Sequence, residues 1–173
     1  ALACEPDLLI ADEATTALDV TVQRQILDLL HDIQRDRDMA MILVSHDLGV
    51  VSNRCDDVAV MYAGRIVEKA PTQRLFDHHE HRYTQALFGA IPRLDTAKHA
   101  RLQTIEGTPP NLSDLPPGCA FAPRCHYRTP QCNAAVPPLR PTDDPAHHFA
   151  CLNPVGGPAA RPTASTSSEE SRI

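Results

Sequence analysis

Residues 8–19 read LLIADEATTALD, four apolar residues followed at once by two carboxylates. An uninterrupted apolar run is typical of a parallel strand that is buried on both faces. Ligands of open α/β sheets bind at the carboxyl ends of the strands, so Asp12 and Glu13 are placed for chemistry. Asp12 is predicted to hold Mg²⁺ through an oxygen, and Glu13 to polarise an attacking water. The plainer alternative is an Asp that caps a helix beside a solvated Glu.

Helix and strand patterns alternate after this stretch. Asp19 is a typical N-cap, and it predicts a helix over residues 20–35. Apolar side chains recur on one face of that helix at Val22, Ile26, Leu29, Leu30 and Ile33. A second apolar run at residues 40–44 predicts another buried strand. The order strand, helix, strand favours a parallel, right-handed βαβ unit.

Polar residues also follow the second strand. Ser45, His46 and Asp47 come directly after it, and parallel strands end together at one edge of a sheet. A single histidine in such a place is more often a structural hydrogen-bonding residue than a catalytic one, so its role depends on its neighbours. Asp47 predicts the N-cap of a helix that ends near Cys55.

These motifs together resemble the ABC-type ATPases. Residues 1–19 are similar to the region that follows the signature motif of that family, with the Walker B strand at 8–12, the catalytic Glu13 and the D-loop at 16–19. ILVSHD at residues 42–47 looks like the strand and switch histidine of the same family. One departure is visible, because Ala14 stands where the family usually has proline.

The resemblance implies a role for each residue of this edge. Asp12 would hold Mg²⁺ through water, and Glu13 would act as the general base. His46 would hydrogen-bond the γ-phosphate and the attacking water. Asp19 would reach across a dimer of ATPase subunits, and Ser45 is counted with Asp12 and Asp19 among the residues that bind the nucleotide cofactor.

Composition limits the class of protein. The chain has 173 residues, a formal net charge of −6 and 42% hydrophobic residues, which is enough for one modest core. Mild acidity without a basic cluster argues against nucleic acid as a partner, because phosphate binding needs concentrated Lys and Arg. No apolar run approaches the length of a membrane span. We expect a chain at the cytoplasmic face of the cell membrane that touches the membrane through a partner.

A complete ATPase of this type needs a glycine-rich P-loop, G-x-x-x-x-G-K-[ST], to hold the phosphates. The 173 residues contain no such segment. We therefore expect the chain to be the C-terminal part of a longer ATPase, inactive by itself.

Residues 57–84 indicate which branch of the ABC-type ATPases the chain resembles. Residues 57–63 and 65–70 predict two strands joined at Gly64 in a β-hairpin, and Pro71 predicts a helix start. HRYT at residues 81–84 is similar to the H-P-Y-T segment of ATPases that drive dipeptide and oligopeptide importers, with Arg82 in place of proline. The nearby histidines 78, 79 and 81 could indicate a metal, but an exposed helix start is the preferred interpretation.

From Pro92 the chain is rich in proline and carries a second chemical cluster. Residues 94–115 are expected to form a linker or wrapping arm. The cysteines follow the pattern Cys119-x5-Cys125-x6-Cys132-x18-Cys151. Disulfides are disfavoured in the cytosol, so thiolate ligation of a metal is the first physical interpretation. Both zinc and an iron–sulfur cluster accept four thiolates, and the absence of C-x2-4-C pairs counts against zinc.

PGCAFAPRC at residues 117–125 resembles the C-terminal cysteine extension of the same importer ATPases, which in some members is associated with a 4Fe-4S cluster. This resemblance ranks a 4Fe-4S cluster first, Zn²⁺ second and unligated thiols third. His147 and His148 are expected to be surface residues. Residues 152–173 are expected to form a disordered tail.

The predicted fold class is α/β: the C-terminal part of a P-loop NTPase (ABC ATPase) parallel sheet with flanking helices, then an irregular Pro/Cys-rich extension. The expected domains are 1–91 (ATPase), 92–151 (extension with the four-cysteine motif) and 152–173 (tail). The implied function is that of an ATP-binding subunit of a dipeptide/oligopeptide importer. Its expected partners are a second ABC ATPase subunit, membrane permease subunits and, indirectly, a peptide-binding protein. The alternatives are a metal-binding or iron–sulfur regulatory module and a non-transport ABC ATPase.

Overall fold

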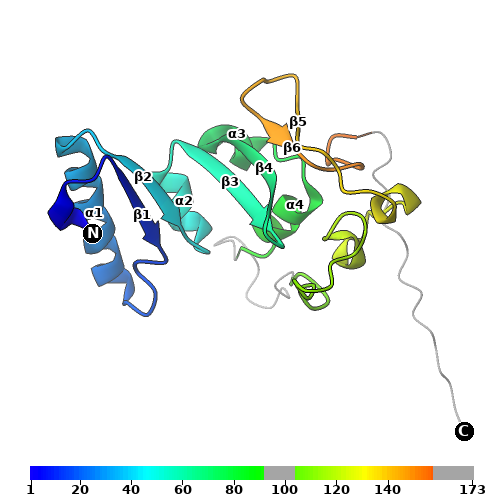
Figure 1. Cartoon of the computed structure of the whole chain (residues 1–173), viewed down its shortest axis with the longest axis horizontal. Helices are drawn as coiled ribbons and strands as arrows, with labels where there is room; N and C mark the ends of the chain where they lie inside the picture. Colours follow the sequence, from blue (N-terminus) through cyan, green and yellow to red (C-terminus); the bar gives the residue numbers. More distant parts are fainter. Residues whose placement is uncertain (92–103, 158–173) are drawn as a thin grey trace, which may run out of the picture. The chain divides into compact units, whose positions relative to one another are not determined.

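The computed structural model describes residues 1–91 and 104–157, and contacts between residues divide the chain into two compact units (Figure 1). Unit 1 comprises residues 1–56, and unit 2 begins at Asp57. Each unit has its own sheet.

Unit 1 is a strand–helix–strand–helix arrangement. Its elements are η1 (Leu2–Cys4), β1 (Leu8–Asp12), α1 (Val20–Asp36), β2 (Ala40–Val44) and α2 (Leu48–Arg54). β1 and β2 pair in parallel, from Leu8 opposite Ala40 to Asp12 opposite Val44. The predicted parallel pair of strands joined by a helix is therefore confirmed.

Two aspartates begin the helices of unit 1, as predicted. Asp19 Oδ1 accepts from the backbone N–H groups of Thr21 and Val22, both at 3.0 Å. Asp47 Oδ1 accepts from those of Gly49 and Val50. Each carboxylate thus pairs N–H groups that have no partner within the helix.

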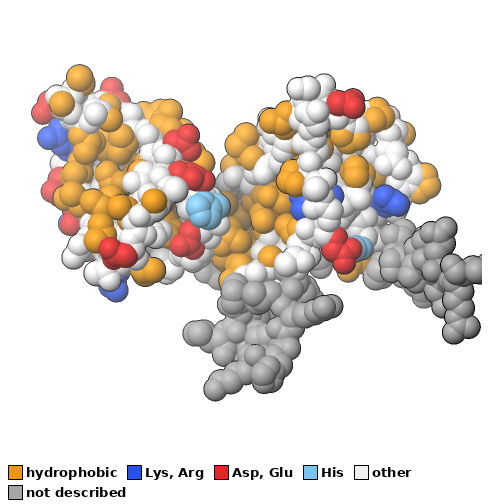
Figure 2. All heavy atoms as spheres, turned by 90° about the horizontal axis from the view of Figure 1, so that it is seen from below, with side chains coloured by type: hydrophobic (Ala, Val, Ile, Leu, Met, Phe, Trp, Pro, Cys, Tyr) orange, Lys and Arg blue, Asp and Glu red, His pale blue; other side chains and the backbone are white. Residues whose placement is uncertain are grey.

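The expected burial of β1 on both faces is wrong for the residues described. Leu9 and Ala11 are buried, but Leu8 and Ile10 are 47% and 63% exposed. Successive side chains of a strand point to opposite faces, so the described part of unit 1 covers only one face of this sheet. Figure 2 shows hydrophobic side chains spread over the surface of this unit. In α1, Leu27 is buried, whereas Leu29, on the predicted apolar face, is 54% exposed.

Unit 2 begins with the predicted β-hairpin. β3 (Asp57–Tyr62) and β4 (Arg65–Pro71) are antiparallel, and Ala63 and Gly64 between them have φ of 49° and 76°. Positive φ at both turn residues matches the twist of the strands. The hairpin belongs to a sheet with strand order β3-β4-β6-β5, where β5 is Arg140–Pro141 and β6 is His148–Phe149.

The hairpin therefore pairs with the C-terminal part of the chain. β4 pairs antiparallel with β6, with Glu68 opposite Phe149. The helices of unit 2 are α3 (Thr72–Asp77), α4 (Arg82–Gly89), η2 (Ala122–Arg124) and η3 (Pro130–Asn133). This pairing joins residues that the sequence divides between the ATPase part and the extension.

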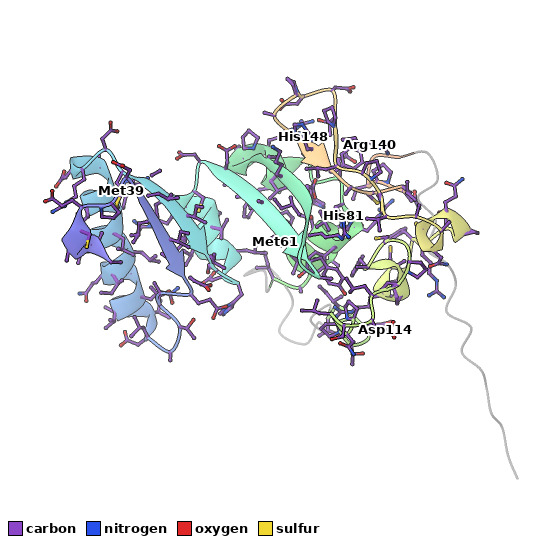
Figure 3. All side chains as sticks on the ribbon, viewed as in Figure 1. Met39, Met61, His81, Asp114, Arg140 and His148 are labelled. Carbon is purple, nitrogen blue, oxygen red and sulfur yellow. The ribbon has the colours of Figure 1, made fainter. Side chains whose placement is uncertain are left out.

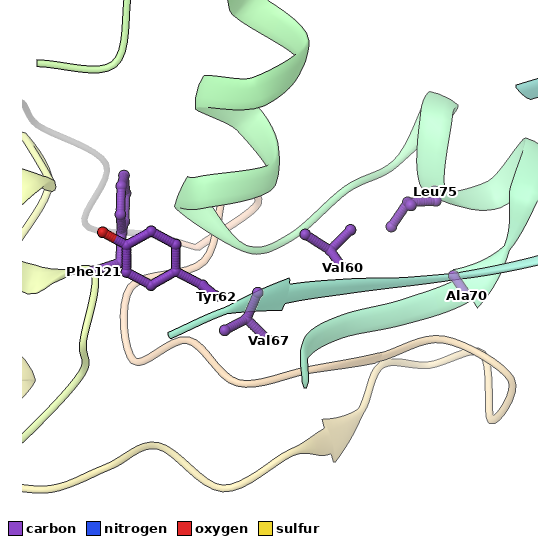
Figure 4. Close-up of a cluster of buried hydrophobic side chains, with 6 residues drawn as sticks. All are labelled: Val60, Tyr62, Val67, Ala70, Leu75 and Phe121. Carbon is purple, nitrogen blue, oxygen red and sulfur yellow. The ribbon is translucent and has the colours of Figure 1, made fainter. Parts of the chain in front are cut away.

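The core of unit 2 packs the hairpin against α3 and the extension. Its buried members are Val60, Tyr62, Val67, Ala70, Leu75 and Phe121 (Figure 4). Tyr62 meets Phe121 edge-on, with ring centroids 5.4 Å apart. A fully buried Leu such as Leu75 contributes several kcal/mol, since truncation to Ala costs about 2–5 kcal/mol.

Within unit 2, the described part of the proline-rich half forms short elements that pack against the β3–β4 hairpin. Ile105 packs against the core, and Arg124 donates to the carbonyls of Ile105 and Glu106. The predicted boundary at residue 92 and the first part of the predicted arm lie outside the described residues, as do residues 158–173 of the predicted tail. The tail's first residues are packed, since Asn153 is 5% exposed. Among the described residues no helix is long and apolar enough to cross a membrane.

Candidate functional site

The carboxyl ends of β1 and β2 form an edge that carries the predicted acidic and histidine residues. Asp12 ends β1 opposite Val44, and the N–H of Glu13 donates to the carbonyl of Val44 at 3.0 Å. His46 lies two residues beyond Val44. The parallel register therefore brings Glu13 and His46 together although 33 positions separate them.

Glu13 is bonded through both carboxyl oxygens. His46 Nδ1 lies 3.1 Å from Oε1, and the Thr16 hydroxyl donates to Oε2 at 2.9 Å. The hydrogen bond to His46, followed by that to Thr16, holds the pKa of Glu13 below its usual value. The Glu13 and His46 side chains are 47% and 78% exposed. The carboxylate is thus ionised at neutral pH and open to solvent.

Glu13 has a left-handed backbone with φ of 46°, which is uncommon for a residue with a side chain. Residues held in sparsely populated conformations cluster at functional sites, because the surrounding bonds must maintain them. Its bonds to Val44 and Thr16 are such constraints. Thr16 belongs to the predicted D-loop, and the sequence signals its bond to Glu13 only through a hydroxyl three residues after a carboxylate.

The other predicted residues of this edge lie nearby in sequence and have local roles. Asp12 is exposed at the end of its strand. Ser45 Oγ accepts from the backbone N–H of Asp47 at 3.0 Å, and Asp19 caps α1. Among the predicted residues of this edge, the structure shows a direct side-chain contact between Glu13 and His46.

Unit 2 contains the second predicted set, the four cysteines. Cys119, Cys125, Cys132 and Cys151 line one small cavity together with His81, Arg82, Phe121, Ala122, Tyr127, Leu152 and Asn153. None of the four is in a disulfide. Cys119 and Cys132 are held close by a bond from the N–H of Cys119 to the carbonyl of Cys132, at 2.8 Å. The fold therefore gathers thiols that the sequence spreads over 33 residues.

Gly118 permits this close approach. A Cβ on Gly118 would lie 2.1 Å from the carbonyl oxygen of Cys132, a distance that no side chain could adopt without backbone movement. Glycine here allows two backbones to touch, which is one of its characteristic uses.

Burial and neighbouring backbone amides act in opposite directions on the pKa values of three of the thiols. Burial raises the pKa of Cys119 and Cys151 and raises that of Cys125 to about 11, while hydrogen bonds from neighbouring amides lower all three. The amides come from Phe121 and Ala122 for Cys119, from Tyr127 for Cys125, and from Asn153 and Arg82 for Cys151. The Thr129 amide lies 3.5 Å from the sulfur of Cys132. Such donors stabilise thiolates, the form that binds metal.

No group of three or more His, Cys, Asp or Glu side chains within residues 1–91 and 104–157 is arranged to hold a metal ion. The four thiols share a cavity without converging on one ligand position.

A buried polar cluster that the sequence did not indicate lies beside β4. Glu68 is fully buried and its Oε1 lies 2.8 Å from His147 Nε2, across 79 positions. Its two oxygens also accept from the backbone N–H groups of Glu80 and His81, at 2.5 and 3.0 Å. The expectation that His147 is a surface residue is wrong, because this pair fixes β4 to the segment before β6.

The expected exposure of the HRYT helix start is also wrong. His81, which is labelled in Figure 3, is the N-cap of α4. Its Nδ1 accepts from the Tyr83 N–H at 3.0 Å. His81 and Arg82 are 1% and 4% exposed. Burial lowers the pKa of His81 to about 4, against the raising effects of Glu68 and of the Ala150 backbone. His81 is thus neutral at physiological pH.

Comparisons with known proteins agree with the motifs. The family described as "Oligopeptide/dipeptide transporter, C-terminal region" matches residues 67–132. A putative peptide import ATP-binding protein of Brucella ovis is 50% identical over 153 residues, covering 86% of this chain and 45% of that protein. The oligopeptide transport ATP-binding protein OppD of Haemophilus influenzae is 54% identical, covering 78% of this chain and 42% of its own length.

The dipeptide transport ATP-binding protein DppD of Bacillus subtilis is 53% identical over 79% of this chain and 41% of its own. The chain thus spans less than half the length of these relatives. High identity over most of the chain, a matching family region and the motif order all agree. Over most of its length the chain is similar to ATP-binding proteins of oligopeptide and dipeptide transporters, and its residues 67–132 match the family described as their C-terminal region.

Proposed function

We propose that this chain provides the water-activating part of an ATPase subunit that drives the import of dipeptides or oligopeptides. The observation that carries the proposal is the contact between Glu13 and His46, at the ends of adjacent parallel strands. The relatives' printed names, which refer to peptide import and to ATP binding, support the same function.

In this proposal Glu13 is the general base that accepts a proton from the attacking water. Its lowered pKa keeps it ionised and ready to accept. His46 fixes the orientation of the carboxylate through Oε1 and aligns the water with the γ-phosphate. Asp19, at the start of α1, is the residue expected to reach a partner subunit.

Bound Mg²⁺ would neutralise charge on the phosphate groups of ATP. Mg²⁺ is usually held by one or two carboxylates with waters and phosphate oxygens, not by a cage of protein ligands. An exposed carboxylate at the end of β1 suits that role, so Asp12 would bind the ion. Ser45, beside His46, would lie among the residues that contact the nucleotide.

The partners proposed for the whole protein are a second ATPase subunit and membrane permease subunits, with a peptide-binding protein acting indirectly. The protein would lie at the cytoplasmic face of the membrane, held by the permeases. We infer functional regions at 1–91 for the ATPase and 92–151 for the extension, followed by a tail.

The variant Glu13→Gln in the longer protein tests the proposed base. Gln keeps the shape of the side chain but cannot take the proton, so ATP binding should persist while hydrolysis nearly disappears. Nucleotide binding and phosphate release are measured on the same preparation. Hydrolysis at the wild-type rate would remove Glu13 as the base.

We also propose that the four cysteines hold a 4Fe-4S cluster, with Zn²⁺ as the second choice. The support is the donor set: four thiols, none in a disulfide, that line one cavity, with the Thr129 amide 3.5 Å from the sulfur of Cys132. Four thiolates suit both groups. Binding would draw the sulfurs together and stabilise an extension that has few large apolar residues.

Anaerobic purification followed by metal analysis and a visible absorption spectrum tests this second proposal. Iron in a fixed ratio to protein, with broad absorption towards the blue, supports the cluster. Zinc without iron would overturn that choice in favour of a structural zinc site. A chain that takes up neither metal would exclude a metal-binding extension.

A further inference from the structure

A cavity in unit 2 lies between the β3–β4 hairpin and the extension, and the proposed ATPase function does not use it. Its volume is about 760 Å³, and its lining comes from within residues 61–67 of the hairpin and residues 115–121 and 136–139 of the extension, together with His81 and Ala150. Binding pockets for small molecules typically have volumes of about 300–1,000 Å³. We propose that this cavity binds a small apolar carboxylate that carries no ammonium group, of the kind found in N-acylated apolar peptides.

The walls of the cavity are mainly apolar. Tyr62, Val67 and Phe121 are buried members of the unit 2 core that also line the cavity (Figure 4). Four further apolar side chains of the lining are 40–59% exposed: Met61, Ile66, Val136 and Leu139. Exposed apolar side chains around a concave site mark a place where a ligand can remove apolar surface from water. The lining therefore favours a ligand with an apolar body.

The charges along the cavity are of one sign. Arg65, the first residue of β4, is exposed and is the only Lys or Arg among the described residues of the lining, which include no Asp or Glu. The salt bridges of the described residues do not involve Arg65. A ligand carboxylate can pair with this guanidinium. An ammonium group would meet no acidic partner, and taking an unpaired charge out of water is costly. The cavity therefore favours an anion over a zwitterion or a cation.

His81 supplies a hydrogen-bond donor. Its ring lines the cavity, and the residue is 1% exposed. Nδ1 accepts from the backbone N–H of Tyr83, so in the neutral ring the proton is on Nε2. Nε2 has no hydrogen-bond partner among the described residues. Because buried polar groups are normally hydrogen-bonded, this N–H is suited to an oxygen acceptor on a ligand.

These features together define the chemistry of the ligand. The carboxylate pairs with Arg65, a carbonyl oxygen accepts from His81 Nε2, and apolar side chains cover the walls. An N-acylated apolar peptide carries all three groups, whereas a free peptide adds an ammonium group. Since the lining comes from both the hairpin and the extension, bound ligand would also stabilise the folded form of unit 2.

Three probes share one apolar body and differ in charge. Acetyl-Leu-Phe has a carboxylate alone, acetyl-Leu-Phe-amide is neutral, and the free dipeptide Leu-Phe is a zwitterion. Isothermal titration calorimetry at neutral pH measures the affinity of each for the 173-residue chain, without nucleotide. We expect acetyl-Leu-Phe to bind most tightly and the amide about 2–5-fold more weakly, as for the loss of an exposed ion pair. Leu-Phe should bind most weakly of the three, because its ammonium group has no partner.

The variant Arg65→Gln tests the carboxylate contact. Arg65 is exposed, so its replacement should leave the fold intact. The variant should bind acetyl-Leu-Phe about 2–5-fold more weakly than the wild type does and bind the amide equally well. Lys69→Gln is the matched control, because Lys69 is an exposed cation of the same strand that does not line the cavity. It should bind all three probes as the wild type does.

NMR of the ¹⁵N-labelled His81 ring tests the donor in the unaltered chain. This ring also borders the four-cysteine cavity, so its own signal is needed to show contact with the ligand. Saturation with acetyl-Leu-Phe should shift the Nε2 signal, and an unshifted signal overturns the contact with His81. Leu-Phe binding as tightly as acetyl-Leu-Phe, or equal affinities of wild type and Arg65→Gln, overturns the recognition of a carboxylate. Absence of saturable binding by all three probes overturns the site and leaves the ATPase proposal untouched, because no nucleotide is present.

Discussion

Two of the glutamate–histidine contacts among the described residues lie in opposite surroundings. In unit 1 Glu13 and His46 meet at 3.1 Å with side chains 47% and 78% exposed. In unit 2 Glu68 and His147 meet at 2.8 Å and are both fully buried. Each pair joins distant positions through strand pairing, but only the first is accessible to a water molecule or a ligand.

The difference shows that burial distinguishes a pair that holds the fold together from a pair that a ligand can reach. The buried Glu68 also accepts two backbone N–H groups, so its oxygens are committed to holding β4 against α4 and the segment before β6. Polar groups buried in this way are costly to disrupt, because a lost partner leaves others unpaired. The exposed Glu13 has partners that solvent can replace.

Among the changes that test this comparison, removal of the buried carboxyl group of Glu68 should have the largest effect on the free energy of unfolding. Glu68→Ala leaves His147 and two backbone amides without their acceptor, so we expect a loss of about 3–5 kcal/mol in the free energy of unfolding. Urea unfolding followed by tyrosine fluorescence measures this, since all three tyrosines (Tyr62, Tyr83 and Tyr127) belong to unit 2.

The matched control for this change is Glu106→Ala. Glu106 also faces a histidine, His126 at 3.7 Å, but the two side chains are 76% and 55% exposed. Exposed pairs contribute about 0–1 kcal/mol, so this variant should unfold almost as the wild type does. Similar losses for the two variants would contradict the distinction between buried and exposed pairs.

The pH dependence of unit 2 tests the cluster next to Glu68. Burial lowers the pKa of His81 from its ordinary 6.5 to about 4. Between these values the unfolded chain binds a proton that the folded chain does not. The contribution of uncharged His81 to the free energy of unfolding is therefore fully present above pH 6.5. It is lost as the pH drops towards 4, by on the order of 3 kcal/mol.

The variant His81→Asn keeps a good N-cap residue but removes the titrating ring. It should be less stable at neutral pH and lose less stability between neutral and acidic pH than the wild type. Urea unfolding at a series of pH values measures both slopes. Parallel pH profiles for wild type and variant would show that folding does not lower the pKa of His81.

The smallest effect is expected at the exposed pair. Thr16→Val removes the hydroxyl bond to Glu13 while His46 remains, so the pKa of Glu13 should rise towards its usual value. NMR titration of the labelled carboxyl carbon measures the shift, with Thr15→Val as the control. The stability should change by less than about 0.5 kcal/mol, as is common at exposed positions. An unchanged pKa of Glu13 would show that the Thr16 hydroxyl does not influence this carboxyl group.

Local patterns predicted much of this molecule. The strands at 8–12 and 40–44, the caps Asp19 and Asp47 and the hairpin around Gly64 depend on residues close in sequence, and each is confirmed. Parallel pairing then predicts that Glu13 and His46 share an edge. Burial was predicted less well, because Leu8 and Ile10 are exposed.

The sequence alone determined the identity of the two chemical sets, the acid–histidine edge and the four cysteines, because their residue types and short-range spacing carry the signal. Only the tertiary structure decided that His147, His81 and Arg82 are buried, and that the hairpin pairs with residues near the C-terminal end of the described chain. The reason is that burial of a polar side chain depends on partners many positions away. Glu68 and His147 are 79 residues apart, and no local pattern connects them.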